Sequence, residues 1–104
     1  MICGQGQLSI SLYELAKKIG VLDRIHFLGF RKDIPYILRN CDGFIFPSFQ
    51  EGLPVSLMEA MATGLPVICS EIRGNVDLID RNGGFLINPI DLVSFTNAMS
   101  FLCQ

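Results

Sequence analysis

One stretch, residues 44–70, constrains the fold of this chain more than any other. It reads FIFPSFQEGLPVSLMEAMATGLPVICS, with an apolar run at each end and, between them, a Gly/Pro loop followed by a helical pattern. Two short apolar runs joined through a helix are typical of parallel strands, because parallel neighbours need a long crossover connection rather than a tight turn. The stretch therefore predicts a strand–helix–strand unit.

The rest of the chain continues this alternation. Leucine and isoleucine recur at helical spacing between residues 8 and 19, and Gly20 follows where a helix-ending glycine belongs. Asp33 can cap a short helix, and Asn75 can cap a helix of one or two turns that ends near residue 80. Asp91 can cap a last helix, with Leu92, Phe95, Met99 and Leu102 on its core face. The expected strands are residues 1–3, 24–30, 43–47, 66–70 and 85–87, with a turn at 81–84.

This order predicts an α/β fold, a Rossmann-like three-layer α/β/α arrangement with a parallel sheet of about five strands. Residues 43–47 form an unbroken apolar run, which favours a central place in the sheet. The 104 residues make at most one domain. In open parallel sheets, ligands bind beyond the carboxyl ends of the strands, so the residues directly after each strand are the candidates for function.

Composition narrows the class of partner. Half of the residues are hydrophobic, 17% are charged and the mean hydropathy is +0.44, which fits strands buried on both faces or a lost partner surface. The net charge of −2 and the scattered basic residues argue against nucleic acid. Four cysteines without metal or disulfide spacing predict buried free thiols in a reducing compartment. No membrane-length apolar run and no signal peptide are visible, so we expect a cytoplasmic protein.

Two carboxylates, Glu51 and Glu59, lie eight positions apart across the junction of loop and helix. Gly52 allows a ligand to approach the backbone closely. The helix start offers free N–H groups at about Val55 and Ser56, and its dipole favours phosphate. Because carboxylates repel phosphate, their partners would be sugar hydroxyls. The combination predicts a phosphate cradle flanked by two carboxylates.

The helix that carries Glu59 leaves a second interpretation open. If the helix begins at Pro54, Glu59 lies about a quarter turn away from an apolar face, where a solvated glutamate is equally possible. That face would combine Pro54, Met58, Met61, Ala62 and Leu65. Residues 50–71 contain no cation, which is unusual for a free-standing acidic surface and favours contact with a ligand.

Weaker candidates follow other strands. Gly4-Gln5-Gly6 resembles the start of a dinucleotide fingerprint, but a GxG without its third glycine favours a tight structural turn. Arg31-Lys32 can touch phosphate or base, or can be ordinary surface residues. Arg73-Gly74-Asn75 can form either a second anion-binding helix start or a simple cap.

Residues 51–68, E-G-L-P-V-S-L-M-E-A-M-A-T-G-L-P-V-I, resemble the E-x7-E segment of family 4 (group 1) retaining glycosyltransferases of GT-B fold. The flanking segments agree in the family's order. These are C-G-Q-G-Q-L, R-I-H-F-L-G-F, D-G-F-I-F-P-S, G-N-V-D-L-I and N-G-G-F-L-I-N-P. The resemblance covers nearly the whole chain and implies the C-terminal, donor-binding domain, residues 1–104 forming one partial nucleotide-sugar-binding domain.

The resemblance implies a role for each matching residue. Glu51 corresponds to the glutamate that contacts the donor sugar, and Glu59 to the one that holds the ribose hydroxyls. Phe30 and Arg31 would approach the nucleobase. The main chain of Gly52, Leu53, Pro54, Val55 and Ser56 would line the sugar and diphosphate. The implied donor is a UDP- or GDP-linked sugar, the implied activity is hexosyl transfer to a glycan or lipid-linked acceptor, and no metal or other cofactor is expected.

Two departures from the family pattern shape further expectations. The family's Arg/Lys pair for the diphosphate follows a strand that this chain lacks, and the N-terminal acceptor domain is absent. We therefore expect a fragment that is inactive alone, that can self-associate through exposed apolar surface, and whose full-length form can be peripheral to the membrane.

Asp77 stands where the family often has an acid. The alternative is a non-catalytic Rossmann-like interaction module; sugar-nucleotide epimerases of similar fold lack the E-x7-E layout.

Overall fold

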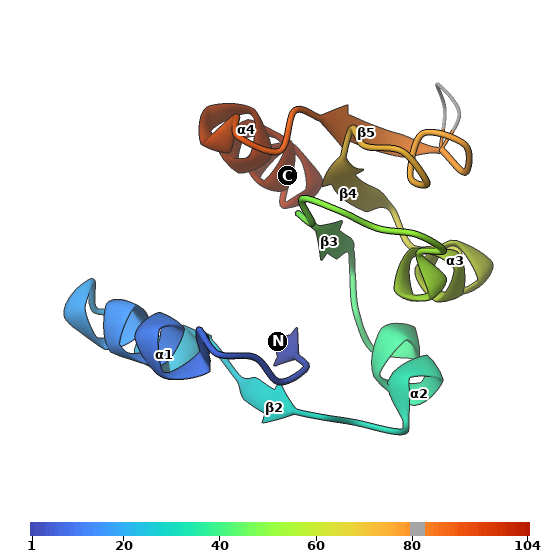
Figure 1. Ribbon diagram of the computed structural model, residues 1–104. Coiled ribbons are helices and arrows are strands. Elements are labelled where there is room, and N and C mark those ends of the chain that lie inside the picture. Colours follow the sequence, from blue (N-terminus) through green and yellow to red (C-terminus); the bar gives the residue numbers. More distant parts are fainter. Residues whose placement is uncertain (80–82) are drawn as a thin grey trace. The chain divides into compact units, whose positions relative to one another are not determined.

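The computed structural model describes residues 1–79 and 83–104, and the chain divides into two compact units, Met1–Ile34 and Pro35–Gln104. Both units contain parallel strands and helices (Figure 1). The expected α/β class with parallel pairing is therefore confirmed. The described residues contain five strands, but these pair as one two-stranded and one three-stranded sheet rather than as a single sheet.

The first unit is a small strand–helix–strand motif. It consists of β1 (Ile2–Cys3), α1 (Ser9–Lys18), a 3-10 helix (Leu22–Arg24) and β2 (Phe27–Gly29), and β1 pairs with β2 in parallel. The expected strand from residue 24 is wrong at its start, since the chain enters β2 only at Phe27. The N–H of Arg24 donates to the carbonyl of Val21 at 2.9 Å, so a local turn satisfies the backbone there.

Helix α1 ends as expected but is poorly covered within its unit. Gly20 has φ +76° and its N–H donates to the carbonyl of Lys17. Ala16 is buried and the Tyr13 ring packs against Phe27, with 5.9 Å between centroids. The other apolar residues of the helical pattern remain exposed, because two strands of two and three residues offer little surface to cover them. These are Leu8, Leu12, Leu15 and Ile19.

The second unit contains the three-stranded sheet. Its elements are α2 (Ile34–Arg39, whose first residue belongs to the first unit), β3 (Phe44–Phe46), α3 (Val55–Ala62), β4 (Val67–Ser70), β5 (Gly84–Ile87) and α4 (Leu92–Leu102). The strand order is β3-β4-β5, all parallel. The expectation that residues 43–47 are central is wrong for this sheet: β4 is central, and its four residues are all buried.

Helices α3 and α4 lie on opposite sides of this sheet (Figure 1). Ile68 and Ile87 form a buried cluster with Phe95 and Ala98 of α4. Because side chains alternate along a strand, Val67 and Cys69 face the α3 side. Within this unit, the expected helix/sheet/helix layering is present.

The core face of α4 differs in part from the expected one. Phe95 is buried and Leu102 packs against the cluster, whereas Leu92 and Met99 are exposed. The cap is confirmed: Asp91 accepts hydrogen bonds from the N–H of Ser94 at 3.0 Å and from its hydroxyl at 2.7 Å. These bonds hold the pKa of the Asp91 carboxyl below its usual range, because they stabilise the ionised form.

The expected helix at Asn75 is wrong. Residues 73–78 form turns, and the predicted end of that helix at residue 80 lies outside the described residues, as do residues 81 and 82 of the turn expected at 81–84. Asn75 is fully buried and uses its amide to hold the backbone of the preceding strand rather than to cap a helix. None of the described helices is long and apolar enough to cross a membrane.

Gly84 is the tightest backbone contact in the three-stranded sheet. A Cβ atom added there would lie 2.5 Å from Cγ2 and 2.6 Å from the carbonyl oxygen of Val67. We predict that Gly84→Ala lowers the free energy of unfolding by about 1–3 kcal/mol, since the added methyl overpacks the β4–β5 pair. Urea denaturation measures the change. Gly6→Ala is the matched control, because an added Cβ meets nothing within 4 Å there; equal effects of both substitutions would contradict the steric explanation.

The cysteines are free, as expected, but they are not uniformly buried. Cys69 is buried, Cys41 half-buried, and Cys3 and Cys103 exposed. Burial raises the pKa of the Cys69 thiol to about 11, because an ionised sulfur is poorly solvated there.

We predict that iodoacetamide at pH 8 alkylates Cys103 much faster than Cys69, because the thiolate is the reactive form and Cys69 is both shielded and protonated. Peptide mass spectrometry over a time course measures both rates. Comparable rates in the folded protein would show that β4 opens readily.

Candidate functional site

The loop after β3 carries the first glutamate. It leads from Pro47 to Pro54, and α3 begins at Val55, so Pro54 occupies the position before the first helical residue. The N–H of Val55 donates to the carbonyl of Leu53 at 2.9 Å and is not free, contrary to expectation. Within the described residues neither the N–H of Ser56 nor that of Leu57 has a backbone acceptor, so these two donors at the helix start remain open to a ligand.

The buried face of α3 differs from the predicted one. Pro54, Leu57 and Ala60 are buried, whereas Met58 is 41% exposed and Ala62 is exposed. The helix therefore turns a different set of side chains to the sheet. Glu59 is half-buried beside this face, and its carbonyl accepts hydrogen bonds from the Thr63 hydroxyl at 2.8 Å and the Thr63 N–H at 3.1 Å.

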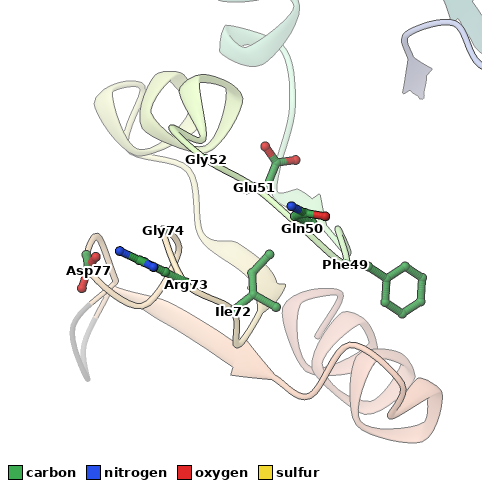
Figure 2. A pocket seen from close by; sticks show the side chains of 8 residues that line it. All are labelled: Phe49, Gln50, Glu51, Gly52, Ile72, Arg73, Gly74 and Asp77. Atoms are coloured by element: carbon green, nitrogen blue, oxygen red, sulfur yellow. The ribbon is translucent and has the colours of Figure 1, made fainter.

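Glu51 lines a pocket of about 510 Å³ at the carboxyl ends of β3 and β4 (Figure 2). One wall is the loop after β3 and the other is the turn after β4. The lining residues are Phe49, Gln50, Glu51, Gly52, Ile72, Arg73, Gly74 and Asp77. This is where ligands bind in open parallel sheets, as the sequence predicted.

Glu59 lines a second pocket of about 420 Å³, together with Pro35, Arg39, Ala62 and Thr63. The structure therefore does not bring the two glutamates into one cavity. Glu51 lies in the loop before α3 and Glu59 lies within α3, each in a pocket with an arginine. A ligand that contacts both must be long enough to extend from one pocket to the other.

The remaining predicted site residues lie outside these two pockets. Leu53 and Val55 are exposed, at 71% and 52%. Phe30 and Arg31 belong to the first unit, where Phe30 is exposed. Arg31 is paired with Asp33 through two hydrogen bonds of 2.8 and 2.6 Å. The pairing raises the pKa of Arg31 and lowers that of Asp33, mainly through the hydrogen bonds.

The turn after β4 packs directly on the Glu51 loop. Gly74 has φ +95°, and a Cβ atom added there would lie 2.9 Å from the carbonyl oxygen of Gly52 and 3.4 Å from that of Glu51. Only glycine fits this approach without strain. The N–H of Glu71 donates to the carbonyl of Ile87 at 2.7 Å, so pairing with β5 continues up to the start of the turn.

The buried side chain of Asn75 holds the same turn on the end of β4. Its side-chain amide donates to the carbonyl of Ser70 at 3.0 Å, and both residues are fully buried. The Asn75 Oδ1 and the Ser70 hydroxyl have no hydrogen-bond partner within the described residues. Burying polar atoms without hydrogen-bond partners costs free energy. Apolar packing alone therefore does not explain why these two polar residues support the turn.

Sequence reasoning identified the lining residues of the two pockets only in part. Gln50 and Ile72 fall within the candidate stretches that follow the strands, residues 48–54 and 71–75, but neither was given a role of its own. Arg39 and Thr63 carried no such signal, because their place beside Glu59 depends on how α2 and α3 pack. Among the described residues, no group of three or more His, Cys, Asp or Glu side chains could hold a metal ion.

Comparison with known sequences identifies the family. The profile of the family described as "Glycosyl transferases group 1" matches residues 1–104, which is the entire chain. The chain belongs to this glycosyltransferase family.

Curated relatives within the family are much longer than this chain. An Escherichia coli UDP-Gal:alpha-D-GlcNAc-diphosphoundecaprenol alpha-1,3-galactosyltransferase is 43% identical over 101 residues, which is 95% of this chain and 26% of the relative. The putative glycosyltransferase EpsD of Bacillus subtilis is 31% identical over 98% of this chain and 27% of its own length. The chain thus spans about a quarter of these group 1 relatives.

Two solved structures share the fold of this chain. Anabaena Alr3699/HepE, crystallised with UDP and glucose, aligns with a TM-score of 0.89 at 27% identity, over 98% of this chain and 30% of that protein. WaaG, a glycosyltransferase involved in lipopolysaccharide biosynthesis, aligns with a TM-score of 0.86 at 30% identity, over 98% of this chain and 28% of WaaG. The α/β fold with parallel strands is therefore that of a group 1 glycosyltransferase segment.

The buried hydrogen bond from Asn75 to the carbonyl of Ser70 leads to a stability prediction. Asn75→Ala should lower the free energy of unfolding by about 1–3 kcal/mol, because the carbonyl of Ser70 loses its buried donor. Ser70→Ala should be close to neutral or slightly stabilising, since its hydroxyl is desolvated without a partner. Denaturant unfolding of the two variants distinguishes them. A larger loss for Ser70→Ala would mean that this hydroxyl has a partner, such as a buried water.

Proposed function

We propose that this chain is the donor-binding part of a retaining glycosyltransferase that transfers a sugar from a UDP- or GDP-sugar to a glycan or lipid-linked acceptor. The observation that carries the proposal is the family match over residues 1–104, combined with Glu51 and Glu59 at the pockets beside α3. The full-length protein would supply the N-terminal acceptor domain, and the transfer reaction would require both parts.

Glu59 is assigned to the ribose of the donor. Its carboxylate lies in a pocket with Thr63 and Arg39, and it can accept hydrogen bonds from two vicinal hydroxyls. The half-buried position reduces competition from water, which strengthens such bonds. In this proposal Phe30 and Arg31 approach the base, for which Arg31 would have to exchange its contact with Asp33.

Glu51 is assigned to the sugar that is transferred, with the backbone of Gly52–Ser56 along the sugar and diphosphate. The open N–H of Ser56 and the positive end of α3 favour the diphosphate, whereas the Glu51 carboxylate is suited to hydroxyl groups. Cationic side chains elsewhere in the full-length protein would neutralise the leaving diphosphate. No metal ion takes part in the proposed chemistry.

The relatives support a UDP-linked donor in particular. The Escherichia coli relative is named for UDP-Gal, and Alr3699/HepE was solved with UDP, with UDP-glucose, and with UDP and glucose. The name of that relative also contains a diphosphoundecaprenol-linked sugar, which supports a lipid-linked acceptor and peripheral contact of the full-length protein with a membrane. The free cysteines support a cytoplasmic location.

Nucleotide binding tests the proposal. By isothermal titration calorimetry, we expect UDP to bind more tightly than GDP, and Glu59→Ala to weaken UDP at least about tenfold, because two charge-assisted hydrogen bonds are lost. Glu14→Ala on the exposed surface of α1 is the matched control and should leave UDP binding unchanged. If Glu59→Ala leaves the UDP dissociation constant unchanged, the result would instead favour a non-catalytic interaction module.

A further inference from the structure

The turn after β4 forms half of the Glu51 pocket, and the proposed function gives it no role. It contributes Ile72, Arg73, Gly74 and Asp77 to the lining, against four residues from the loop after β3. The pocket volume of about 510 Å³ is within the range of small-molecule sites. The question is which part of the donor contacts this second wall.

This wall is rigidly built, unlike an ordinary surface turn. Gly74 touches the backbone of the Glu51 loop, so Arg73 is held next to that loop by its covalent neighbour. The N–H groups of Asn75 and Val76 both donate to the carbonyl of Ile72, at 3.1 and 3.2 Å, and the buried Asn75 amide ties the turn to β4. Preorganised polar groups of this kind give specificity at little entropic cost on binding.

The charges of the lining limit what can bind. Glu51 and Asp77 contribute two negative charges and Arg73 one positive charge, so the lining carries a net charge of −1. A phosphate would be repelled by two carboxylates and attracted by one guanidinium. A neutral sugar meets no such penalty, because each hydroxyl can donate to a carboxylate and accept from the guanidinium.

Arg73 is available for such a contact. Its side chain is exposed and forms no ion pair in the part of the chain that the structure describes. Figure 2 shows it extending toward the part of the turn that carries Asp77, while the Glu51 carboxylate points away from this turn. The guanidinium is therefore not neutralised by Glu51, and both groups remain free to bind hydroxyls.

We propose that Arg73 and Asp77, held by Gly74 and Asn75 opposite the Glu51 loop, bind hydroxyls of the transferred sugar and determine which neutral hexose or N-acetylhexosamine the site accepts. This inference rests on the proposed function. It assigns the turn to the glycosyl group of the donor rather than to its diphosphate, and it makes both residues specificity determinants.

The test compares nucleotide with nucleotide-sugar. Dissociation constants of this chain are measured by titration calorimetry for UDP, UDP-glucose, UDP-galactose, UDP-N-acetylglucosamine and UDP-glucuronate. The ratio of the UDP value to the UDP-sugar value isolates the contribution of the sugar. For the preferred neutral sugar, Arg73→Met should reduce this ratio about tenfold, as expected for a lost charge-assisted hydrogen bond, and leave UDP itself unchanged.

Three further variants make the result specific. Arg73→Lys should recover part of the ratio, because the ammonium keeps the charge but lacks the planar fork of donors. Lys17→Met, which removes an exposed cation from α1, should change neither constant. Asp77→Asn should reduce the ratio for the preferred sugar and weaken the discrimination against UDP-glucuronate, because it removes one negative charge from the pocket.

The possible outcomes separate this inference from the proposed function. Loss of UDP binding in Glu59→Ala with an unchanged sugar ratio in Arg73→Met would uphold the donor site and overturn the role of Arg73. Equal weakening of UDP and UDP-sugar in Arg73→Met would assign the guanidinium to the diphosphate and overturn the inference. So would tighter binding of UDP-glucuronate than of every neutral donor, or no gain from any sugar in the unmodified chain.

Discussion

The parallel pairing of β4 with both of its neighbours is the constraint on which both walls of the Glu51 pocket depend. All four residues of β4 are buried, and their backbone groups pair with β3 on one side and β5 on the other. Because the strands run in the same direction, the loop after β3 and the turn after β4 emerge at the same edge. A register shift of one residue would exchange the side chains that face α3 with those that face α4 and would move the turn away from Glu51.

Close backbone contact then converts this common edge into a defined pocket. Gly74 approaches the carbonyls of the Glu51 loop to a distance that no side chain would allow, and Asn75 holds the turn on the end of β4. Burying the Asn75 side chain with an unpartnered oxygen costs free energy, and this cost arises directly beside the Glu51 pocket. Such local costs are common where the position of a functional group matters more than stability.

Sequence patterns predicted the elements well where a local signal was strong. The Gly20 helix end, the Asp91 cap and the strands at β3 to β5 all follow from short-range chemistry. The patterns failed where packing decides. The buried face of α3 combines Leu57 and Ala60 rather than Met58 and Ala62, and β4 rather than β3 is central, because the orientation of a helix and the order of strands are long-range properties. The predicted helix at Asn75 is replaced by turns in which the asparagine serves the core instead of a cap.

The amino-acid sequence by itself determined the family, the parallel α/β class and the placing of Glu51 and Glu59 on either side of a helix start. These depend on residue order and on local propensities that the chain carries wherever it folds. Only the tertiary structure decided that the two glutamates line separate pockets and that Arg73 and Asp77 share one with Glu51. The physical reason is that residues 20 or more positions apart meet through strand pairing and backbone contact, which no local pattern specifies.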